Sequence, residues 1–518
     1  MSWKPEVEEL ARREAFAERM GGEERVERAR AAGRLTVRER IERLLDPGTF
    51  RETGALAGRS AYDENGRLVE VRPSNFVCGR GEIDRRAVIV GGDDFTVRGG
   101  AADGAVGDKQ GWAERAALAG RRPIVRLVDG TGGGGSVKTN KKLARSYLPV
   151  LFGWETSVEL MSTVPVVAAA LGPVAGLGAA RVAASHFSVM VRETSQVFVA
   201  GPPVVRRALG REVGKEELGG HRIHARGSGA VDNEAESEEE AFAQIRAFLS
   251  YLPGSVYEAP PRVEPDDDPG RAEEALLSIV PRDRRKTYDV RELLGLVLDR
   301  GSLFEMSRHY GRAVVTGLAR LDGYAVGVLA HDPRVAAGAI DADESEKIVR
   351  FFDLCDTFHL PLVYFVDNPG FMVGVEAERR GAIRKGVRAV TAAYQASVPR
   401  VSILIRKVFG VGGGLHAGPG LLGRYAWPSA EWGSLPIEGG VEAAYRRRLE
   451  ASDDPDALRA QLESELSGLR SPFRTAEAFG VEEIIDPRRT RPLLVDFARQ
   501  AHDLVRTRLG PKRRGARP

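Results

Sequence analysis

The chain has 518 residues and a mass of 56.2 kDa, which is too long for one ordinary hydrophobic core and predicts roughly two to four domains. Its 42% hydrophobic and 29% charged residues are typical of a soluble globular protein. A formal net charge of +3, with scattered basic residues, argues neither for nor against binding of nucleic acid, and we expect no nucleic-acid partner.

Cysteine usage and hydropathy indicate the compartment. The two cysteines, Cys78 and Cys355, cannot form a disulfide framework or a CxxC metal motif, and they fit a reducing cytoplasm. Residues 1–40 are charged throughout and contain no apolar secretory signal. The longest apolar run, 164–180, is interrupted by prolines and glycines and is too short to span a membrane. We therefore expect a cytoplasmic protein without a membrane segment, whose basic tail at 511–518 is a solvated end.

The N-terminal part of the chain predicts helices. A charged amphipathic helix is expected up to about Gly33, and residues 36–50, TVRERIERLLDPGTF, follow as a short helix closed by an Asp-Pro-Gly turn. A closely related phrase, DVRELLGLVLDRGSLF, returns at 289–304. This return is the first sign of an internal duplication.

Between residues 84 and 132 the first half of the chain aligns with the second half at a constant offset of 238 residues. A period this long does not fit a solenoid repeat and predicts a duplicated domain. We place the N-terminal domain at 1–260 and the C-terminal domain at 281–518, with an exposed linker rich in proline and acidic residues at 254–274. The matched positions include Asp84 with Asp322, Asp94 with Asp332, Gly100 with Gly338, Lys109 with Lys347, Asp129 with Asp367, and Gly132 with Gly370.

Each half repeats one order of elements. The predicted elements are a strand at 87–91 and 325–329, a helix at 109–119 and 344–358, and a strand ending in aspartate at 123–129 and 361–367. A glycine-rich loop, another helix and another strand follow in both halves. Because strands and helices alternate, the predicted fold class is α/β, with sheets covered by helices.

The most informative stretch is 398–414, VPRVSILIRKVFGVGGG, where a buried strand leads directly into a glycine-rich turn. Residues 164–178, VPVVAAALGPVAGLG, repeat its Val-Pro start and the spacing to its glycines. In this alignment Gly176, Leu177 and Gly178 correspond to Gly410, Val411 and Gly412.

These turns have a specific chemical use. A strand that ends at Gly-x-Gly and begins a helix leaves consecutive backbone N–H groups unpaired at the positive end of the helix dipole. Such a pair stabilises an oxyanion, including the enolate of a thioester. Glycine permits the close approach, and the middle residue contributes only its N–H. The alternative is that the glycines serve only the packing of helix against strand; their occurrence in both halves favours a functional role.

Other motifs carry less information. Residues 129–136, DGTGGGGS, lack the order of a phosphate loop and are expected to line a ligand cleft. Lys109 and Lys347 begin equivalent helices, where a solvated helix face is favoured over contact with phosphates. The eight histidines form no HExxH motif and no metal is predicted; for His416, near the second turn, a structural or solvent-facing role is favoured. Residues 425–432, YAWPSAEW, form a lid, an interface or simple packing.

A family resemblance is carried by phrases that recur in order from about residue 38 to residue 497. The chain resembles the carboxyltransferase (beta) subunits of biotin-dependent acyl-CoA carboxylases, of the propionyl-CoA and methylcrotonyl-CoA type. That family is similar in fold to two tandem crotonase-like domains, which agrees with the duplication. The phrases include LLDPGTF, DFTVRGG, GPVAGLGAA, SVMVRETSQVFVAGPPVV, EELGGHRIHARGSGAV, VDNPGFMVG, AIRKGVRAVTAAYQASVPRVSILIRKVFG and WGSLPIEGG.

The resemblance implies two oxyanion holes. In such enzymes the hole of the N-terminal domain, here the N–H groups of Gly176 and Leu177, holds the thioester oxygen of the acyl-CoA as its enolate forms. The hole of the C-terminal domain, here Val411 and Gly412, holds the ureido oxygen of biotin. The loops around the two holes are expected to bind substrate through Gly132, Gly133, Gly134, Gly178, Gly370, Phe371, Gly410, Gly413 and Gly414.

The resemblance also implies a cofactor and partners. Carboxybiotin, attached to a biotin carboxylase or biotin carboxyl carrier subunit, supplies the carboxyl group, and a coenzyme A thioester receives it. The cofactor itself serves as the base, so no side-chain catalytic triad is expected. Family members are commonly hexamers. The implied activity is that of a carboxyltransferase subunit which produces an α- or γ-carboxylated acyl-CoA, and no metal is expected.

The chain departs from the family pattern at three places, one of which is the first-domain loop: it usually reads Ser-Gly-Gly-Ala, and here residues 131–135 read TGGGG. The second hole usually reads Tyr-Gly-Gly-Ala, whereas this chain has Phe409, Gly410, Val411 and Gly412. Gly414 stands where an aspartate or a larger aliphatic residue often sets acyl selectivity, which predicts a differently shaped acyl pocket. Two alternatives stay open: the same site acting in reverse in a biotin-dependent, sodium-pumping decarboxylase, and an inactive homologue that scaffolds a biotinylated partner. A membrane subunit encoded in the same operon would favour the first.

Overall fold

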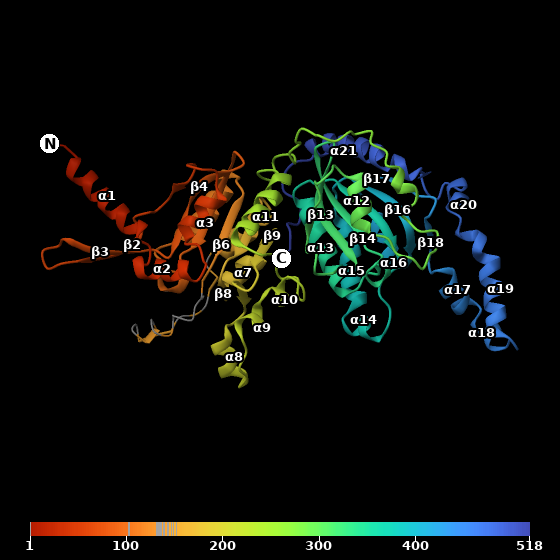
Figure 1. The fold of residues 1–518 in the computed structure, drawn as a ribbon, viewed down its shortest axis with the longest axis horizontal. Helices are drawn as coiled ribbons and strands as arrows, with labels where there is room; N and C mark the ends of the chain where they lie inside the picture. The colour runs from red at the N-terminus through yellow and green to blue at the C-terminus, as the bar shows by residue number, and fades with distance from the viewer. Residues whose placement is uncertain are drawn as a thin grey trace. The chain divides into compact units, whose positions relative to one another are not determined.

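The computed structural model describes residues 2–101, 104–130 and 153–517, together with 137, 140–141, 144–146, 148 and 150–151. The chain divides into two compact units (Figure 1). Unit 1 contains Met1–Ser250, Gly254–Tyr257 and Pro511–Pro518. Unit 2 contains Tyr251–Pro253 and Glu258–Gly510. Each unit is built on one mixed sheet between two layers of helices.

The sheet of unit 1 begins with an antiparallel hairpin and continues with parallel strands. This arrangement gives a largely buried sheet, and each central strand is a continuous buried run, as parallel strands require. In sheet order the strands are β1 (Arg51–Glu52), β4 (Phe76–Ile83), β5 (Arg86–Asp93), β6 (Ile124–Val128), β7 (Val166–Ala170), β9 (Phe187–Val191) and β11 (Asn233–Ala235). Two smaller pairs lie beside it, β2 (Gly58–Tyr62) with β3 (Leu68–Pro73) and β8 (Pro173–Ala175) with β10 (Gln196–Phe198).

The sheet of unit 2 repeats this order and the same pattern of directions. Its strands are β12 (Phe304–Met306), β13 (Val314–Leu321), β14 (Tyr324–His331), β15 (Leu362–Asn368), β16 (Arg400–Phe409), β17 (Leu421–Ala426) and β19 (Glu483–Ile484), and β18 (Glu431–Gly433) pairs with the end of β16. The predicted α/β fold class and the predicted duplication are therefore confirmed.

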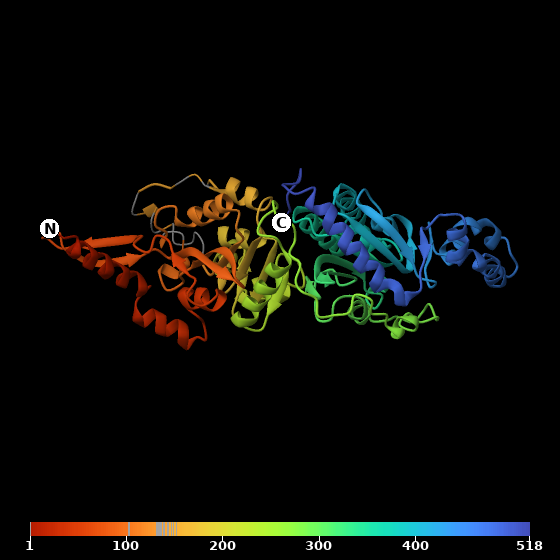
Figure 2. The same cartoon turned by 90° about the horizontal axis from the view of Figure 1, so that it is seen from above.

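Helices cover both faces of each sheet. In unit 1, α4 (Lys109–Gly120), α6 (Trp154–Leu160) and α7 (Leu177–Ala183) pack on one face, and α3 (Val37–Leu44) and α11 (Glu238–Tyr251) on the other. In unit 2, α13 (Ala342–Thr357) and α15 (Ala382–Gln395) cover one face, while α12 (Val290–Val297) and α21 (Thr490–Arg506) close an extensive apolar core on the other (Figure 2).

The remaining helices lie outside these layers. These described helices are α1 (Lys4–Glu18), α2 (Glu23–Ala31), α8 (Pro202–Leu209), α9 (Lys215–Gly219), α10 (His221–His224), α14 (Val375–Arg379), α16 (Gly410–Gly413), α17 (Ile437–Ala444), α18 (Arg446–Glu450), α19 (Pro455–Ser467) and α20 (Pro472–Glu477). The first two of these, α1 and α2, replace the single helix expected up to Gly33.

The duplication extends to backbone geometry after β5 and β14. Gly100 and Gly338 both have positive φ, 63° and 85°. A Cβ on either glycine would lie 2.4 Å from the carbonyl oxygen of Asp129 or Asp367, respectively. Only glycine permits that approach, so both glycines are fixed by the neighbouring strand end rather than by chance.

Two segments expected to be exposed are packed. The supposed linker at 254–274 begins buried, since Val256 is fully buried and its N–H donates to the Thr163 carbonyl at 2.9 Å. The basic tail returns to unit 1, where the Ala516 N–H donates to the Met161 carbonyl at 3.3 Å. Both segments are rich in charged residues, but each contains a few small or apolar residues, such as Val256 and Ala516, that pack against unit 1.

Candidate functional site

The first glycine turn lies between β8 and α7 in unit 1. Gly176 has φ 64° and ψ −124°, a conformation that requires glycine. Leu177 begins the helix with 41% of its surface exposed. The first intrahelical bond runs from the Ala180 N–H to the Gly176 carbonyl at 3.0 Å, so the N–H groups of Leu177 and Gly178 belong to the donors that a helix leaves without intrahelical acceptors. The N–H of Gly176 itself donates to the Phe198 carbonyl at 3.2 Å.

The second glycine turn follows β16 in unit 2. Gly410 has φ 61°, and α16 and the short 3₁₀ turn Gly414–His416 follow directly. Val411 is 68% exposed, whereas Gly412 and Gly413 are buried. The Val411 and Gly412 N–H groups are again first-turn donors of a helix.

The two turns match in more than sequence. Gly176 and Gly410 adopt nearly equal φ angles of 64° and 61°. The strand before each turn is paired at its end with a short parallel strand, β10 in unit 1 and β18 in unit 2. Each turn is then continued by a helix with an exposed residue at its start: Leu177, the first residue of α7, and Val411, the second residue of α16. The fold therefore presents two equivalent sets of backbone donors, one in each unit.

Residues 370–371 lie against the second turn. A Cβ on Gly412 would lie 3.0 Å from the carbonyl carbon of Gly370 and 3.0 Å from the nitrogen of Phe371. Gly370 has φ 115°, and its N–H donates to Asn368 Oδ1 at 2.7 Å. Gly414, in contrast, has open space where a Cβ would be added.

The other predicted substrate glycines divide in the same way. Gly413 is tightly packed, with a Cβ position 2.9 Å from the Val408 carbonyl carbon. Gly178 is intermediate, because a Cβ there would lie 3.1 Å from the Val174 side chain, which would have to shift slightly. Gly132, Gly133 and Gly134 lie outside the described residues.

Buried aspartates end the strands next to both turns. Asp129 after β6 is bound by Arg40 at 2.8 Å and by Arg34, and its N–H donates to Asp93 Oδ2 at 3.1 Å. Asp367 in β15 accepts from Arg406 Nε at 3.1 Å. Burial raises the pKa of Asp93 to about 7. These carboxylates are part of the support beneath the turns.

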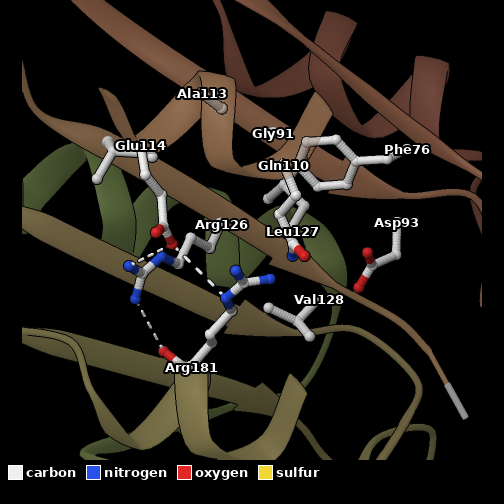
Figure 3. A pocket seen from close by; sticks show the side chains of 11 residues that line it. Phe76, Gly91, Asp93, Gln110, Ala113, Glu114, Arg126, Leu127, Val128 and Arg181 are labelled. Atoms are coloured by element: carbon white, nitrogen blue, oxygen red, sulfur yellow. Dashed lines mark hydrogen bonds and ion pairs between the residues drawn. The ribbon is translucent and has the colours of Figure 1, made fainter. Parts of the chain in front are cut away.

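A cavity of about 20 Å³ lies beside Asp93 and is lined by residues of β5, β6, α4 and α7 (Figure 3). Its charged lining residues are Asp93, Glu114, Arg126 and Arg181, and Val128 and Phe76 are among its apolar ones. This volume is about that of one water molecule. Sequence reasoning missed the arginines here, although an arginine inside the apolar strand 124–128 was a visible signal.

Two predicted lysine roles are wrong. Lys347 is 4% exposed, and its Nζ donates to four backbone carbonyls, those of Ser307, Tyr310, Gly311 and Val314, at 2.7–3.3 Å. Lys109 is also mostly buried, with Nζ 3.5 Å from Glu52 Oε1, and burial lowers its pKa. Neither lysine lies on a solvated helix face, because segments distant in sequence pack against them: residues 307–314 against Lys347 and Glu52 of β1 against Lys109.

The remaining candidates are structural. His416 is buried, and its Nδ1–H donates to the Gly413 carbonyl at 2.7 Å, while burial lowers its pKa. Trp427, within the segment 425–432, is part of the apolar core, and its indole N–H donates to Thr490 Oγ1 at 3.0 Å. Among the described residues, no cluster of histidine, cysteine and acidic side chains is arranged to hold a metal. None of the described helices has the length and apolarity that a membrane crossing needs.

The architecture defines a class of protein. Two successive units of the crotonase fold, each presenting a glycine turn with backbone donors, form the framework of a carboxyltransferase. A solved structure of transcarboxylase 12S, described as a hexamer assembly with methylmalonyl-coenzyme A bound, superimposes with a TM-score of 0.87 at 32% identity, covering 99% of both chains.

Sequence comparison agrees with the fold. The model of the carboxyl transferase domain family matches residues 28–515. The carboxyltransferase subunit of propionyl-CoA carboxylase from Haloferax mediterranei is 36% identical over 500 residues, 96% of each chain. The alpha subunit of methylmalonyl-CoA decarboxylase from Veillonella parvula is 33% identical over 479 residues, 92% of each chain. The chain belongs to the carboxyl transferase family, as a biotin-dependent carboxyltransferase of the acyl-CoA carboxylase type, and the predicted resemblance is confirmed.

Proposed function

We propose that the protein transfers CO₂ from carboxybiotin on a partner protein to the α- or γ-carbon of an acyl-CoA. The observation that carries the proposal is the pair of equivalent glycine turns, Gly176 with φ 64° and Gly410 with φ 61°, each followed by first-turn N–H donors. In the overall step a C–N bond to the biotin ureido nitrogen breaks and a C–C bond to the acyl carbon forms. The proton lost from that carbon goes to the ureido nitrogen, so the transfer is redox-neutral.

The proposal assigns the first turn to the acyl-CoA. The thioester oxygen gains negative charge when the proton next to the carbonyl is removed, and backbone donors that are already oriented stabilise that charge. Leu177 contributes its N–H from the first helical position. The Gly176 N–H, assigned to the same hole, is directed at Phe198 in this structure, which gives Leu177 the larger share.

The proposal assigns the second turn to biotin. Bound there, biotin supplies the carboxyl group and a basic ureido centre. The residues present suit such a group: a ureido oxygen needs N–H donors, which Val411 and Gly412 provide, and it needs room, which the open space at Gly414 offers. Val411 and Gly412 orient that oxygen, and Gly370 and Phe371 hold Gly412 in place by direct contact.

The glycines around the turns are the proposed substrate-binding residues. Their small size lets ligands approach the backbone closely. On the acyl-CoA side we propose the N-terminal unit with Gly132, Gly133, Gly134 and Gly178, and on the biotin side the C-terminal unit with Gly370, Phe371, Gly410, Gly413 and Gly414.

Partners and assembly follow from the relatives. We propose a biotin carboxylase or biotin carboxyl carrier subunit as the source of carboxybiotin, since the named relatives are subunits of such enzymes. The hexamer described for transcarboxylase 12S supports a hexamer here. The two cysteines, both free and buried, support a cytoplasmic location.

Reconstitution tests the proposal. The protein is mixed with a biotinylated carboxylase partner, ATP, labelled bicarbonate and a panel of acyl-CoAs that begins with propionyl-CoA, and acid-stable label is counted. We expect label in at least one carboxyacyl-CoA, with none when the partner is left out. A stable complex that fixes no label with any acyl-CoA would instead support a scaffolding role.

A second function has one observation in its favour, the 33% identity to a methylmalonyl-CoA decarboxylase subunit. In that case the same turns act in the reverse direction, and CO₂ leaves the carboxylated acyl-CoA for biotin. Biotin-dependent loss of label from a carboxyacyl-CoA, together with a membrane subunit that co-purifies with the chain, would favour it.

A further inference from the structure

A buried arginine holds the helix that starts at the first glycine turn. Arg126 lies in the middle of β6 and is 6% exposed. One terminal nitrogen of its guanidinium donates to the carbonyls of Arg181 at 3.2 Å and Ala184 at 2.8 Å, at the C-terminal end of α7. The other donates to Glu114 Oε1 at 2.9 Å, and Figure 3 shows the guanidinium between this carboxylate and the Arg181 carbonyl. One side chain thus ties α4 to α7.

A second buried arginine does the same for the second turn. Arg400, the first residue of β16, has no exposed surface. Its guanidinium donates to the Ala417 carbonyl at 2.9 Å, directly after the segment that continues the second glycine turn. It also donates to Ala396 at 3.2 Å and to Ala393, at the C-terminal end of α15. The contacts again join the end of the turn segment to a covering helix.

The duplication shows that these arginines are not required by the fold. Tyr364 of unit 2 occupies the position equivalent to Arg126 of unit 1, and the Tyr364 hydroxyl lies 2.8 Å from His331 Nε2. Val166 of unit 1, a fully buried apolar residue, occupies the position equivalent to Arg400, because it pairs with Ile124 as Arg400 pairs with Leu362. Each sheet folds without an arginine at the position where the other has one. Two non-equivalent positions have nevertheless acquired an arginine with the same type of contact.

Burying a guanidinium is costly, and the cost is visible in both residues. Burial lowers the pKa of Arg126 and of Arg400 to about 10. An apolar side chain would avoid this penalty, as many replacements of buried charges by apolar groups do. A cation at a helix C-terminus is favourable, and the fork of donors fixes two or three carbonyls at once. In exchange for this cost, each arginine orients a short segment whose other end is the glycine turn.

We infer that Arg126 and Arg400 are positioning residues, each of which orients one glycine turn by holding the far end of its short helical segment; the inference rests on the proposed function of the turns. α7 has 7 residues and the Gly410–His416 segment has two short turns. Both segments are too short to bend, so a shift at the held end moves the donors. A displacement of about 1 Å at a reacting group costs about a hundredfold in rate.

The two arginines provide matched controls for each other. Arg126→Met and Arg400→Met remove the same group from equally buried sites in different units, and Arg126→Lys and Arg400→Lys keep the charge without the fork. The readouts are the infrared carbonyl bands of two labelled ligands bound to the protein: ¹³C-thioester propionyl-CoA and ¹³C-ureido biotin on its carrier protein. Oriented donors lower these frequencies, so the band reports hole geometry independently of stability.

Arg126→Met is expected to return the thioester band towards its value in solution and to leave the ureido band unchanged, while Arg400→Met does the reverse. In both variants kcat falls about 10- to 100-fold, KM for the acyl-CoA changes less than about threefold, and the lysine variants lie between wild type and methionine. If a methionine variant does not fold, the lysine variant is judged by the same two bands.

Bands that stay at their wild-type positions in folded variants, or that shift together in both variants, would overturn the inference. A wild-type protein that shifts neither band would instead refute the proposed function of the turns. Asp232→Asn, which replaces the buried carboxylate that accepts from the Ser188 N–H and hydroxyl in unit 1, serves as a stability control and is expected to shift neither band.

Discussion

Replacing Leu177 by proline separates the first turn's chemistry from its structure. Proline has no N–H, and the first helical position is where a helix tolerates it best, because that N–H has no intrahelical acceptor. Leu177 occupies this position in α7, with 41% of its surface exposed. Leu177→Pro therefore removes one proposed oxyanion donor without removing an intrahelical hydrogen bond. Leu177→Ala truncates the same side chain and keeps the N–H.

The structure sets the size of both effects. Truncating a leucine that is more than one third exposed costs the folded state about 1 kcal/mol, and the proline variant is expected to lose no more than about 1 kcal/mol beyond the alanine variant. Loss of one oxyanion-hole donor, in contrast, lowers kcat about 10²- to 10³-fold, which corresponds to about 2.7–4 kcal/mol at the transition state. The catalytic effect thus exceeds the structural one.

The assay is carboxylation of propionyl-CoA with the reconstituted biotinylated partner, measured together with chemical unfolding of each variant. Leu177→Ala is expected to stay within about fivefold of the wild-type kcat, and Leu177→Pro to fall at least about a hundredfold. Equal kcat values for the two folded variants would show that the Leu177 N–H is not a donor to the reacting oxygen. The first turn would then be a packing device.

Three further predictions test the surroundings. Gly412→Ala, whose new Cβ would lie 3.0 Å from the loop backbone, is expected to lose about 1–3 kcal/mol of stability and most activity; Gly414→Ala, which enters open space, should unfold like wild type, and equal losses would contradict the packing argument. Burial raises the pKa of Asp93 from 3.8 to about 7 in the folded state, so the free energy of unfolding falls as pH rises between these two values. In urea unfolding, the free energy of unfolding of Asp93→Asn should exceed that of wild type by about 4 kcal/mol at pH 8 and equal it near pH 4. A difference that does not depend on pH would argue against the buried charge. Lys347→Met removes the side-chain donor from four buried carbonyls, of which those of Ser307 and Gly311 keep a backbone N–H partner, and should cost about 3 kcal/mol. Lys385→Met, which removes a partly exposed ion pair, should cost less than about 1 kcal/mol, and similar losses would contradict the buried role of Lys347.

Much of the fold was readable from the sequence because duplication supplies its own control. The turn at Gly176 was matched to Gly410 by spacing alone, and their φ angles agree within a few degrees. Strand positions followed from continuous apolar runs, which parallel sheets require. The constant offset between the halves then predicted one topology repeated twice.

What the sequence could not show was which polar side chains are buried. Lys347 and Lys109 look like solvated residues at helix starts, because nothing local indicates that a loop will fold over them. Arg126 contacts carbonyls 55 and 58 residues away in sequence, and Arg400 contacts one that is 17 residues away as well as two nearer ones; no motif records the longer separations. The roles of the two turns also needed the family resemblance, since N–H groups carry no mark of the ligand they serve.

The return of residues 511–517 to unit 1 has a consequence for the order of events during synthesis. Ala516 packs beside Met161 in the core of unit 1, yet it leaves the ribosome only after all of unit 2 has been made. Unit 2 therefore has its complete set of contacts before unit 1 does. Unit 1, although it is made first, therefore completes its contacts last.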